Sequence, residues 1–413
     1  MQPKSSIPDD LSLWLAGAAA AATVVSIAAF EILLALALIA LIIQKRLRLP
    51  PIAIPLALWF VLTLISAAAS GQARDAMPQV KKFYVYLMLL AVYSAFRQAW
   101  QMRLLLGALA AGATLSALWS FVQFAHKVQV ARQAHENFYA SYVGARITGF
   151  MGHWMTFSGE MMIVLLLISA FLFFAERRLS LPLLAAACVI TVALLAGFTR
   201  SMWLGALVGG VYLLWFWQKR VLLALPVLGG LLLAANPFSL RDRVVSSFEP
   251  HGEMDSNEHR VITRRVGYRM IQAHPWLGVG PEEVGKQFEA YLPEDVPWPL
   301  PPGYYGHLHN IYVHYAAERG IPAALALLWA IGLALWDFIG AARRELDQRV
   351  QWVLHGAIAV ILAVMVSGFY ELNLGDSEVL GLFLSVLGIG YGALKQAASK
   401  PISAEWKPVS TLT

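Results

Sequence analysis

The segment HRVITRRVGYRMIQAHPWLGVGP, residues 259–281, interrupts a chain that otherwise consists largely of apolar runs. It lies in a stretch rich in arginine and histidine, residues 236–310, and a further apolar run follows directly. Long polar stretches between hydrophobic segments are typical of loops outside the membrane. We therefore expect residues 236–310 to form a large loop that apolar helices hold against a membrane surface.

The composition indicates an integral membrane protein. Of the 413 residues, 59% are hydrophobic and 14% are charged, whereas about a quarter are charged in a typical soluble domain. The net charge of +6 comes from short basic clusters between apolar runs, which is typical of membrane-flanking charge and argues against nucleic-acid binding. The single cysteine, Cys188, lies in an apolar run and excludes a disulfide framework or a thiolate metal cluster.

Twelve apolar segments predict an all-α polytopic membrane protein with about 12 transmembrane helices. The long loop lies between spans nine and ten, and residues 1–413 form one membrane domain. The first two segments are continuous except for an expected break near Glu31, so eleven spans is the alternative. The segments are residues 11–29, 31–44, 52–69, 83–96, 104–124, 154–175, 181–198, 202–217, 221–235, 311–336, 352–370 and 378–394.

Lysine and arginine in the short connections predict the orientation. They are concentrated in the connections that face the cytoplasm if the N-terminus is cytoplasmic. We therefore expect both termini in the cytoplasm and an N-terminus that is retained, not cleaved as a signal peptide. The extracytoplasmic segments are then residues 70–82, 125–153, 236–310 and 371–377.

The long loop contains one helical pattern. Residues 262–274 have helical spacing, which predicts a short amphipathic helix on the membrane surface. HPWLGVGP, residues 274–281, ends this helix because proline and glycine cannot continue it. The proline-rich residues 291–307 are expected to stiffen one rim of a cavity. The residues expected near one side of the helix are Val261, Tyr268, Ile271 and Gln272.

Four motifs occur in order along this predicted topology: TGF after Arg146, FTRSMWLG at 198–205, Arg260 followed by AHPWLGVGP, and HN at 309–310 with Gly320 in an H-N-x9-G pattern. Together they resemble the O-antigen ligase family. These bacterial glycosyltransferases of the GT-C type act in lipopolysaccharide biosynthesis. The resemblance implies that polysaccharide is transferred from undecaprenyl pyrophosphate to the lipid A core, at the periplasmic face of the inner membrane, without a metal or other cofactor. The long loop would be the periplasmic loop and form the lid of the active site.

A pyrophosphate donor explains the arginines in these motifs. Arginine stays charged and can hold two phosphate oxygens at once, whereas lysine acts as a point charge. The resemblance gives this role to Arg200 and to Arg260, which precedes Pro275 by fifteen residues. The alternative is an arginine that extends to lipid headgroups, or a headgroup-binding face. Further candidates are Arg146, Arg265 and Lys81, and Arg264 also competes with Arg260.

His309 is the expected general base. An imidazole has a pKa near the working pH, and His309 with Asn310 begins the H-N-x9-G pattern. The alternative is a histidine that only caps or anchors the following span. His307 and His314 match no part of the pattern, and their spacing from His309 does not place three ligands on one helical face. We therefore expect no metal site.

Three further residues are expected to support the site: Asn310, Tyr312 and Glu371. Glu371 lies in FYELNLGDSE with Asn373 and Asp376. We favour capping of the turn before the last span, and the alternative is a carboxylate that faces the cavity. Tyr312 is also explained by an interfacial belt of aromatic residues.

Other functions remain open. O-antigen polymerases and protein O-oligosaccharyltransferases use the same lipid carrier and share the general form of the motifs. A transporter or flippase for lipid-linked oligosaccharides belongs to a different class, in which arginines bind an anionic lipid without group transfer. Such a protein should carry acidic coupling residues inside its spans, but apart from Glu31 and Glu160 the spans have almost none. This favours an enzyme that binds a lipid-linked donor, a lipid A-core acceptor and membrane lipids.

Overall fold

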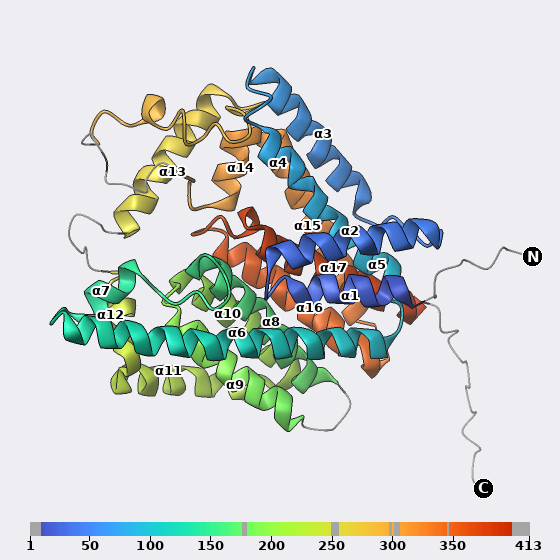
Figure 1. Cartoon of the computed structure of the whole chain (residues 1–413), viewed down its shortest axis with the longest axis horizontal. Coiled ribbons are helices and arrows are strands. Elements are labelled where there is room, and N and C mark those ends of the chain that lie inside the picture. The colour runs from blue at the N-terminus through green and yellow to red at the C-terminus, as the bar shows by residue number, and fades with distance from the viewer. Residues whose placement is uncertain are drawn as a thin grey trace, which may run out of the picture.

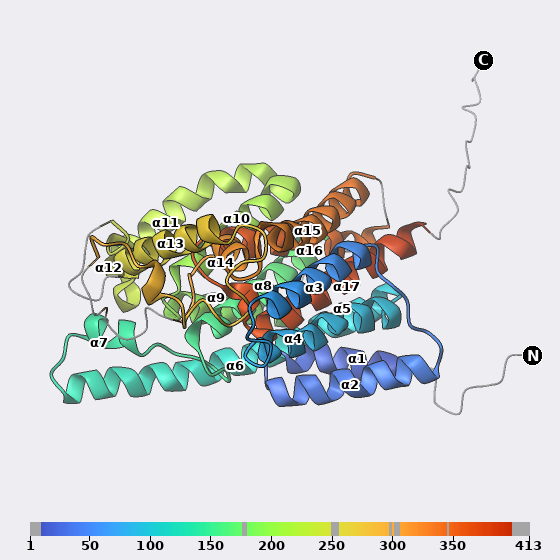
Figure 2. The ribbon, with the colours of Figure 1, turned by 90° about the horizontal axis from the view of Figure 1, so that it is seen from above.

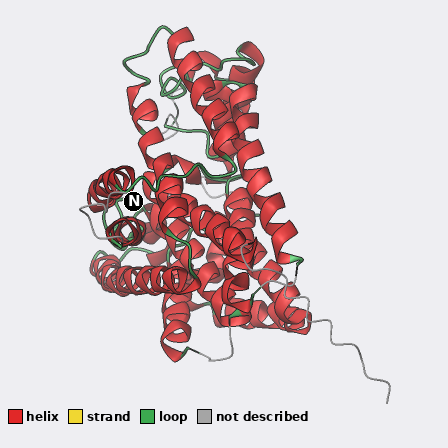
Figure 3. Ribbon diagram, turned by 90° about the vertical axis from the view of Figure 1, so that its right-hand side faces the viewer, coloured by secondary structure: helices red, strands yellow, loops and turns green. Residues whose placement is uncertain are grey.

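A computed structural model describes residues 10–175, 180–248, 256–296, 300, 306–344 and 347–398. Within these ranges every regular element is a helix, as the colouring in Figure 3 shows, which confirms the all-α class. Much of the proline-rich segment expected at the cavity rim lies outside the described residues.

The chain folds into the following helices (Figure 1). Up to residue 196 they are α1 (Leu11–Ala22), α2 (Ile27–Ile43), α3 (Ala53–Ala69), α4 (Met77–Lys81), α5 (Phe83–Ala95), α6 (Ala99–Gln133), α7 (Phe138–Gly144), α8 (Trp154–Phe174) and α9 (Leu181–Ala196). Beyond it they are α10 (Arg200–Gln218), α11 (Ala224–Ala235), α12 (Leu240–Val245), α13 (Ser256–Ala273), α14 (Ile311–Arg319), α15 (Ile321–Ala342), α16 (Gln348–Ser367) and α17 (Ser377–Ala398). Short 3-10 turns are η1 (Lys219–Leu223), η2 (Pro237–Ser239), η4 (Glu289–Tyr291) and η5 (Asn373–Gly375).

Several helices are long and apolar enough to cross a membrane. In the described part of the chain six stretches qualify, while α1, α2, α3 and α9 are apolar but shorter. These helices indicate a multi-pass membrane protein, and the number of twelve spans stays a prediction. The six stretches are Ala99–Gln133, Trp154–Phe174, Arg200–Ala235, Ile321–Ala342, Arg349–Ser367 and Ser377–Gln396.

The first apolar run breaks earlier than expected. The predicted break near Glu31 is wrong, because Glu31 lies inside α2 and the chain leaves the helix between Ala22 and Ile27. At this point Thr23 donates its hydroxyl to the carbonyl of Ala20 at 2.7 Å. Ser26 then caps α2 through its side chain. Local hydroxyl bonds of this kind compete with the helix and favour a turn.

The predicted span 311–336 is also wrong as a single helix, because Gly320 separates α14 from α15. Gly320 has φ +86°, and a Cβ atom on it would lie 2.1 Å from the carbonyl oxygen of Trp276. The amide of Ile321 donates to the carbonyl of Pro275 at 2.8 Å. Only glycine combines this backbone conformation with such a close approach. Gly320 of the H-N-x9-G pattern is thus the point where the PWLGVGP loop docks.

The centre of the bundle holds α8, α16 and α17, and α10 crosses α16 closely (Figure 2). Cβ atoms on Gly205 and Gly209 of α10 would lie 2.7 and 2.9 Å from the carbonyl oxygens of Ala363 and Ala359 in α16. Small residues let helix backbones approach in this way. The contact fixes the start of α10 relative to the end of α16, and both of these ends contribute to the site.

The loop between α11 and α14 has a hydrophobic core of its own. The amphipathic helix predicted there is present as α13, and it packs against α14 (Figure 1). The expected apolar side is wrong at Val261 and Tyr268, which are each 52% exposed, whereas Ile271 does pack against this core. Side chains four residues apart, at 262, 266 and 270, face α14 instead. This core contains Ile262, Val266, Met270, Val279, Val284, Phe288, Val296, Leu300, Leu308, Val313 and Ala317.

Candidate active site

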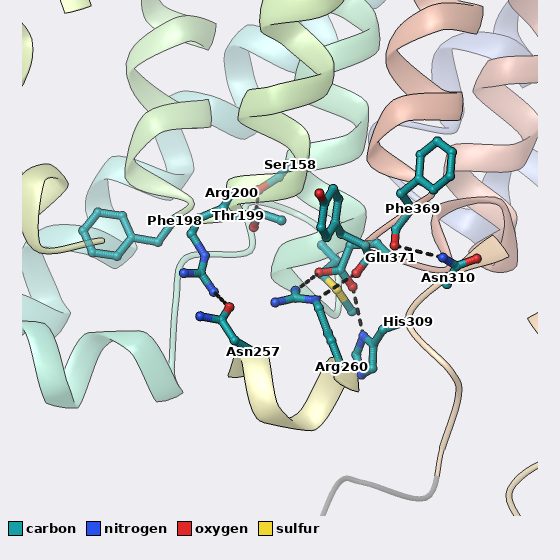
Figure 4. A network of polar contacts seen from close by, with 12 residues as sticks. Ser158, Phe198, Thr199, Arg200, Asn257, Arg260, His309, Asn310, Phe369 and Glu371 are labelled. Carbon is teal, nitrogen blue, oxygen red and sulfur yellow. Dashed lines mark hydrogen bonds and ion pairs between the residues drawn. The ribbon is translucent and has the colours of Figure 1, made fainter. Parts of the chain in front are cut away.

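One buried carboxylate joins the expected base to an arginine (Figure 4). Glu371 lies in the turn after α16 and is 3% exposed. Its Oε1 is 2.5 Å from Nη2 of Arg260, and its Oε2 is 3.1 Å from Nδ1 of His309. Arg260 also donates from Nε to the carbonyl of Tyr370 at 3.1 Å. Glu371 therefore links Arg260 of α13 to His309, which lies two residues before the start of α14.

Glu371 is ionised at neutral pH. Burial alone would raise its pKa, but the guanidinium of Arg260 and the imidazole of His309 outweigh burial and lower it to about 2. A carboxylate beside Nδ1 favours the tautomer with hydrogen on that nitrogen, which leaves Nε2 of His309 as the basic atom. Capping, the role that we favoured for Glu371, is wrong, since its carboxylate binds Arg260 and His309 and borders a cavity.

The residues next to His309 anchor it. His309 has φ +47°, an uncommon conformation for a residue with a side chain. Asn310 caps α14 by accepting a hydrogen bond from the first turn at 2.9 Å, and it donates to the carbonyl of Phe369 at 3.0 Å. The hydroxyl of Tyr312 donates to the carbonyl of Met365 at 2.8 Å. Asn310 and Tyr312 thus fasten the start of α14 to the end of α16.

Arg200 extends from the first turn of α10 toward α13 (Figure 4). Its Nη2 donates to Oδ1 of Asn257 at 2.9 Å, and its Nη1 donates to the hydroxyl of Ser247 at 2.9 Å and that of Ser246 at 3.3 Å. Asn257 and Arg260 are three residues apart on α13 and hence lie on neighbouring positions of one face. Arg200 of α10 therefore contacts the helix that carries Arg260, the second predicted phosphate-binding arginine.

A strained turn presents Arg200. Phe198 has φ +50°, and its carbonyl oxygen accepts from Nε of Arg243 at 3.0 Å and from Nη1 of Arg146 at 3.4 Å. The hydroxyl of Ser158, on α8, donates to that of Thr199 at 3.0 Å. Two guanidinium groups and one helix hydroxyl therefore hold the FTRS turn in place.

The arginines form a positively charged cluster, which we define as Arg146, Arg200, Arg243 and Arg260. Burial lowers the pKa of Arg146 to about 9, and repulsion from Arg243 contributes further. Burial also lowers the pKa of Arg243, which is 4% exposed. The guanidinium of Arg146 stands 5.0 Å above the ring of Trp154. Glu371 offsets part of this charge, and a bound anion would relieve the rest.

Arg243 belongs to the cluster although no sequence motif marks it as a site residue. It lies in SLRDRVV, one of several basic residues after the ninth apolar run, and no motif distinguishes it from Arg241. Its alternation with an acid at Asp242 is a weak signal. Only the fold shows that it turns inward, to the carbonyl of Phe198.

Two predicted donor-binding residues lie elsewhere. Arg265 forms a two-pronged, exposed ion pair with Asp295, at 2.9 and 2.6 Å. Lys81, at the end of α4, borders an apolar groove of about 930 Å³ between α3 and α5. Neither of them contacts His309, Glu371 or the arginine cluster, so the structure does not bring them to the candidate site.

A comparison with known families agrees with this arrangement. Residues 184–328 match the O-antigen ligase family. The match confirms, for this part of the chain, the resemblance inferred from the motifs. No curated protein matches the chain. The matched range contains Arg200, Arg243, Arg260 and His309, and it ends before Glu371.

The O-antigen ligase family indicates a glycan-transferring enzyme in a membrane, with a lipid-linked glycan donor and a lipid-type acceptor. The geometry is compatible with such chemistry. An anionic leaving group would find guanidinium groups, and a hydroxyl nucleophile would find an oriented imidazole.

Proposed function

We propose that the protein transfers O-antigen polysaccharide from undecaprenyl pyrophosphate to a hydroxyl of the lipid A core, at the periplasmic face of the bacterial inner membrane. The observation that carries this proposal is the contact of Glu371 with both His309 and Arg260, beside the arginine cluster. In this proposal His309 is the base and the arginine cluster is the pyrophosphate site, and their closeness supports direct transfer between two lipid-linked substrates.

The arginine cluster supports binding of the donor. A pyrophosphate carries several negative charges, and in a partly buried site fixed cations stabilise charge more strongly than in water. Arg200 offers its guanidinium at the surface between α10 and α13, while Arg146 and Arg243 add positive charge from behind the FTRS turn. As the bond between the anomeric carbon and the phosphate oxygen breaks, these groups stabilise the negative charge of the departing undecaprenyl pyrophosphate. Arginine charge makes a metal ion unnecessary for this step.

His309 supports activation of the acceptor. The hydroxyl oxygen attacks the anomeric carbon, and the hydroxyl proton passes to Nε2 of His309. Glu371 then stabilises the imidazolium that forms, as a carboxylate does in other histidine-dependent transfer reactions. Arg260 keeps Glu371 ionised and in place, so we assign Arg260 to activation of the acceptor as well as to binding of the donor. In this proposal residues 236–310 act as the lid and both termini lie in the cytoplasm.

Replacement of the base is the direct test. His309→Ala should lower the rate of transfer by about 10²-fold or more, the size expected for the loss of a positioned base, and leave donor binding largely unchanged. His274→Ala is the matched control. His274 directly follows the C-terminal end of α13 and forms a hydrogen bond with the hydroxyl of Tyr291, so its replacement should change the rate little. Near-normal turnover of His309→Ala, or donor binding that falls with the rate, would contradict the assignment.

The identity of the acceptor needs a separate measurement. Purified protein is incubated with an undecaprenyl-pyrophosphate-linked glycan and either lipid A core or a second donor molecule. Glycan that moves only onto the core supports the ligase, and lengthening of the carrier-linked chain selects a polymerase. Movement of the intact donor across a vesicle membrane, with no new glycosidic bond, would select a flippase.

A further inference from the structure

A basic pocket of about 430 Å³ lies against the C-terminal part of α6, next to the loop that carries Arg146. Helix α6 runs along one edge of the bundle (Figure 2). The lining of this pocket, which we call the α6 pocket, contains no carboxylate. It also shares no residue with the polar cavity that Glu371 borders. The polar residues of the lining are Gln123, His126, Lys127, Arg146 and Thr148.

The α6 pocket holds positive charge without a counter-ion. Lys127 is half-buried, and within the described ranges of the chain its ammonium group has no hydrogen bond or ion pair. Arg146 donates from Nε to the carbonyl of Val143 at 3.0 Å and from Nη1 to that of Phe198 at 3.4 Å, and both acceptors are neutral. Burial and repulsion from Arg243 both lower the pKa of Arg146. An anion in the pocket would offset both charges, as partly buried cations require.

The wall of the α6 pocket is preformed. The side chain of Gln123 accepts from the amides of Thr148 and Gly149 at 2.9 and 3.0 Å, and it donates to the carbonyl of Gly149 at 2.9 Å. Gly149 has φ +57°, and a Cβ atom on it would lie 2.4 Å from the hydroxyl of Ser116. The loop therefore lies directly on α6 and holds Arg146 and Thr148 at fixed positions beside it.

An apolar stripe leads away from the α6 pocket along the helix. Leu115, Leu118, Trp119 and Val122 are between 48% and 59% exposed, and their spacing places them on one face. Because α6 is long and apolar enough to cross a membrane, this face meets lipid chains. From Leu115 to His126 the helix rises about 16 Å, which is about half of the roughly 30 Å hydrocarbon core. A chain on the stripe would thus have its headgroup at the pocket.

We propose that the α6 pocket binds the headgroup of an anionic phospholipid, whose acyl chain lies on the apolar stripe. The phosphate oxygens pair with the ammonium group of Lys127 and the guanidinium of Arg146, and the hydroxyl of Thr148 donates to them. A zwitterionic phospholipid adds an ammonium group, which these cations repel. Phosphatidylglycerol is therefore preferred over phosphatidylethanolamine. Free phosphate lacks the chain that uses the stripe.

This lipid is distinct from the proposed donor. Arg200 bonds Asn257 of α13, and Arg260 bonds Glu371, whereas neither arginine lines the α6 pocket. Of the arginine cluster, the described lining contains Arg146 alone. The proposal goes beyond the proposed function, because phospholipid binding needs neither the base nor group transfer.

Two substitutions remove groups of the α6 pocket. Lys127→Ala removes the ammonium group, and Thr148→Val removes the hydroxyl while it keeps the shape of the side chain. Arg132→Ala is the matched control, because Arg132 is an exposed cation on the same end of α6 and lines a different pocket. Thermal unfolding of each variant in detergent shows that it is folded.

The first measurement is binding of a phospholipid whose acyl chain carries bromine, which quenches tryptophan fluorescence. Delipidated full-length protein in detergent is titrated with brominated phosphatidylglycerol, and the quenching that is lost in Trp119→Phe belongs to the stripe. Lys127→Ala should raise the Kd about 5-fold, Thr148→Val should raise it less, and Arg132→Ala should keep it within about 2-fold. Brominated phosphatidylethanolamine should bind about 5-fold or more weakly than phosphatidylglycerol. An unchanged Kd in Lys127→Ala, no preference between the two lipids, or unchanged quenching in Trp119→Phe would overturn the proposal.

Competition identifies the source of the phosphate. Inorganic phosphate in large excess should not displace the brominated lipid, and displacement would reduce the pocket to a site for a free anion. Undecaprenyl pyrophosphate that displaces the lipid at equal concentration would assign the pocket to the donor and refute the phospholipid. The titration should give the same Kd in the His309→Ala background. Failure of the proposed function would therefore leave this result unchanged, and failure of lipid binding would leave the role of His309 intact.

Discussion

Replacing Glu371 by glutamine removes the charge that joins His309 to Arg260 of α13, while it keeps the size of the side chain. Lowering a carboxyl pKa from 4.5 to about 2 corresponds to about 3 kcal/mol of interaction that favours the ionised form. Glu371 is almost fully buried, so solvent screens little of this interaction. Glu371→Gln should therefore lower the free energy of unfolding by about 3 kcal/mol at pH 7, since Arg260 loses its charged partner.

The same variant has a predicted pH signature. The pKa of Glu371 in the folded protein lies below its value in the unfolded chain, so its contribution is complete above about pH 4.5. It is lost as the pH falls from about 4.5 to about 2. Wild-type protein should accordingly lose more stability over this window than Glu371→Gln, and the two melting temperatures should converge.

Catalysis should respond differently from donor binding. The variant loses the carboxylate that stabilises the imidazolium, so kcat should fall by about 10²-fold. Donor affinity should stay the same or rise, because Arg260 loses its ion pair with Glu371. The measurements are thermal unfolding in detergent between pH 2 and 8, transfer rates, and equilibrium donor binding. Equal stability at pH 7, or weaker donor binding in proportion to the rate, would refute this account.

Three further outcomes are expected. Arg200→Lys should reduce transfer nearly as much as Arg200→Ala, because a point charge cannot reproduce the guanidinium fork. Full activity of the lysine variant in a transfer assay would contradict the phosphate role. Arg265→Ala is the control and should have a mild effect, because Arg265 lies in an exposed ion pair. Transfer should survive EDTA without added divalent ions, whereas loss on chelation and rescue by one metal would contradict arginine-based neutralisation. Gly320→Ala should lower the melting temperature markedly, because its Cβ would collide with the carbonyl of Trp276, and an unchanged melting curve would show that the loop is not docked there.

The local features of the chain were predictable because they depend on neighbours in sequence. Apolar runs showed the helical class, and short motifs selected Arg200, Arg260 and His309. The break at Gly320 was not predictable from α14 alone, since its cause is the carbonyl of Trp276, forty-four residues earlier. Periodicity likewise could not tell which side of α13 packs, because its partner α14 lies beyond a long loop.

Glu371 and Arg243 show the same limit at the site. The sequence of the turn at Glu371 is compatible with capping, and only the folded chain brings its carboxylate to Arg260, 111 residues away. Arg243 acquires its place from the carbonyl of Phe198, 45 residues earlier. Residue type indicates what a side chain can do, but such long-range pairing decides what it does.

In the proposed orientation, the length of α6 would give the height of the proposed reaction above the cytoplasmic boundary. From Arg103 to Gln123 the helix rises about 30 Å, which is about the thickness of the hydrocarbon core. The side-chain oxygen of Gln123 accepts from the amides of Thr148 and Gly149, in the loop that carries Arg146. In the proposed orientation, an upright α6 would hold the arginine cluster level with the outer headgroups. A polyprenyl carrier could keep its whole tail in the bilayer while its charged end was at this level, so the donor would not have to be lifted from the membrane to react.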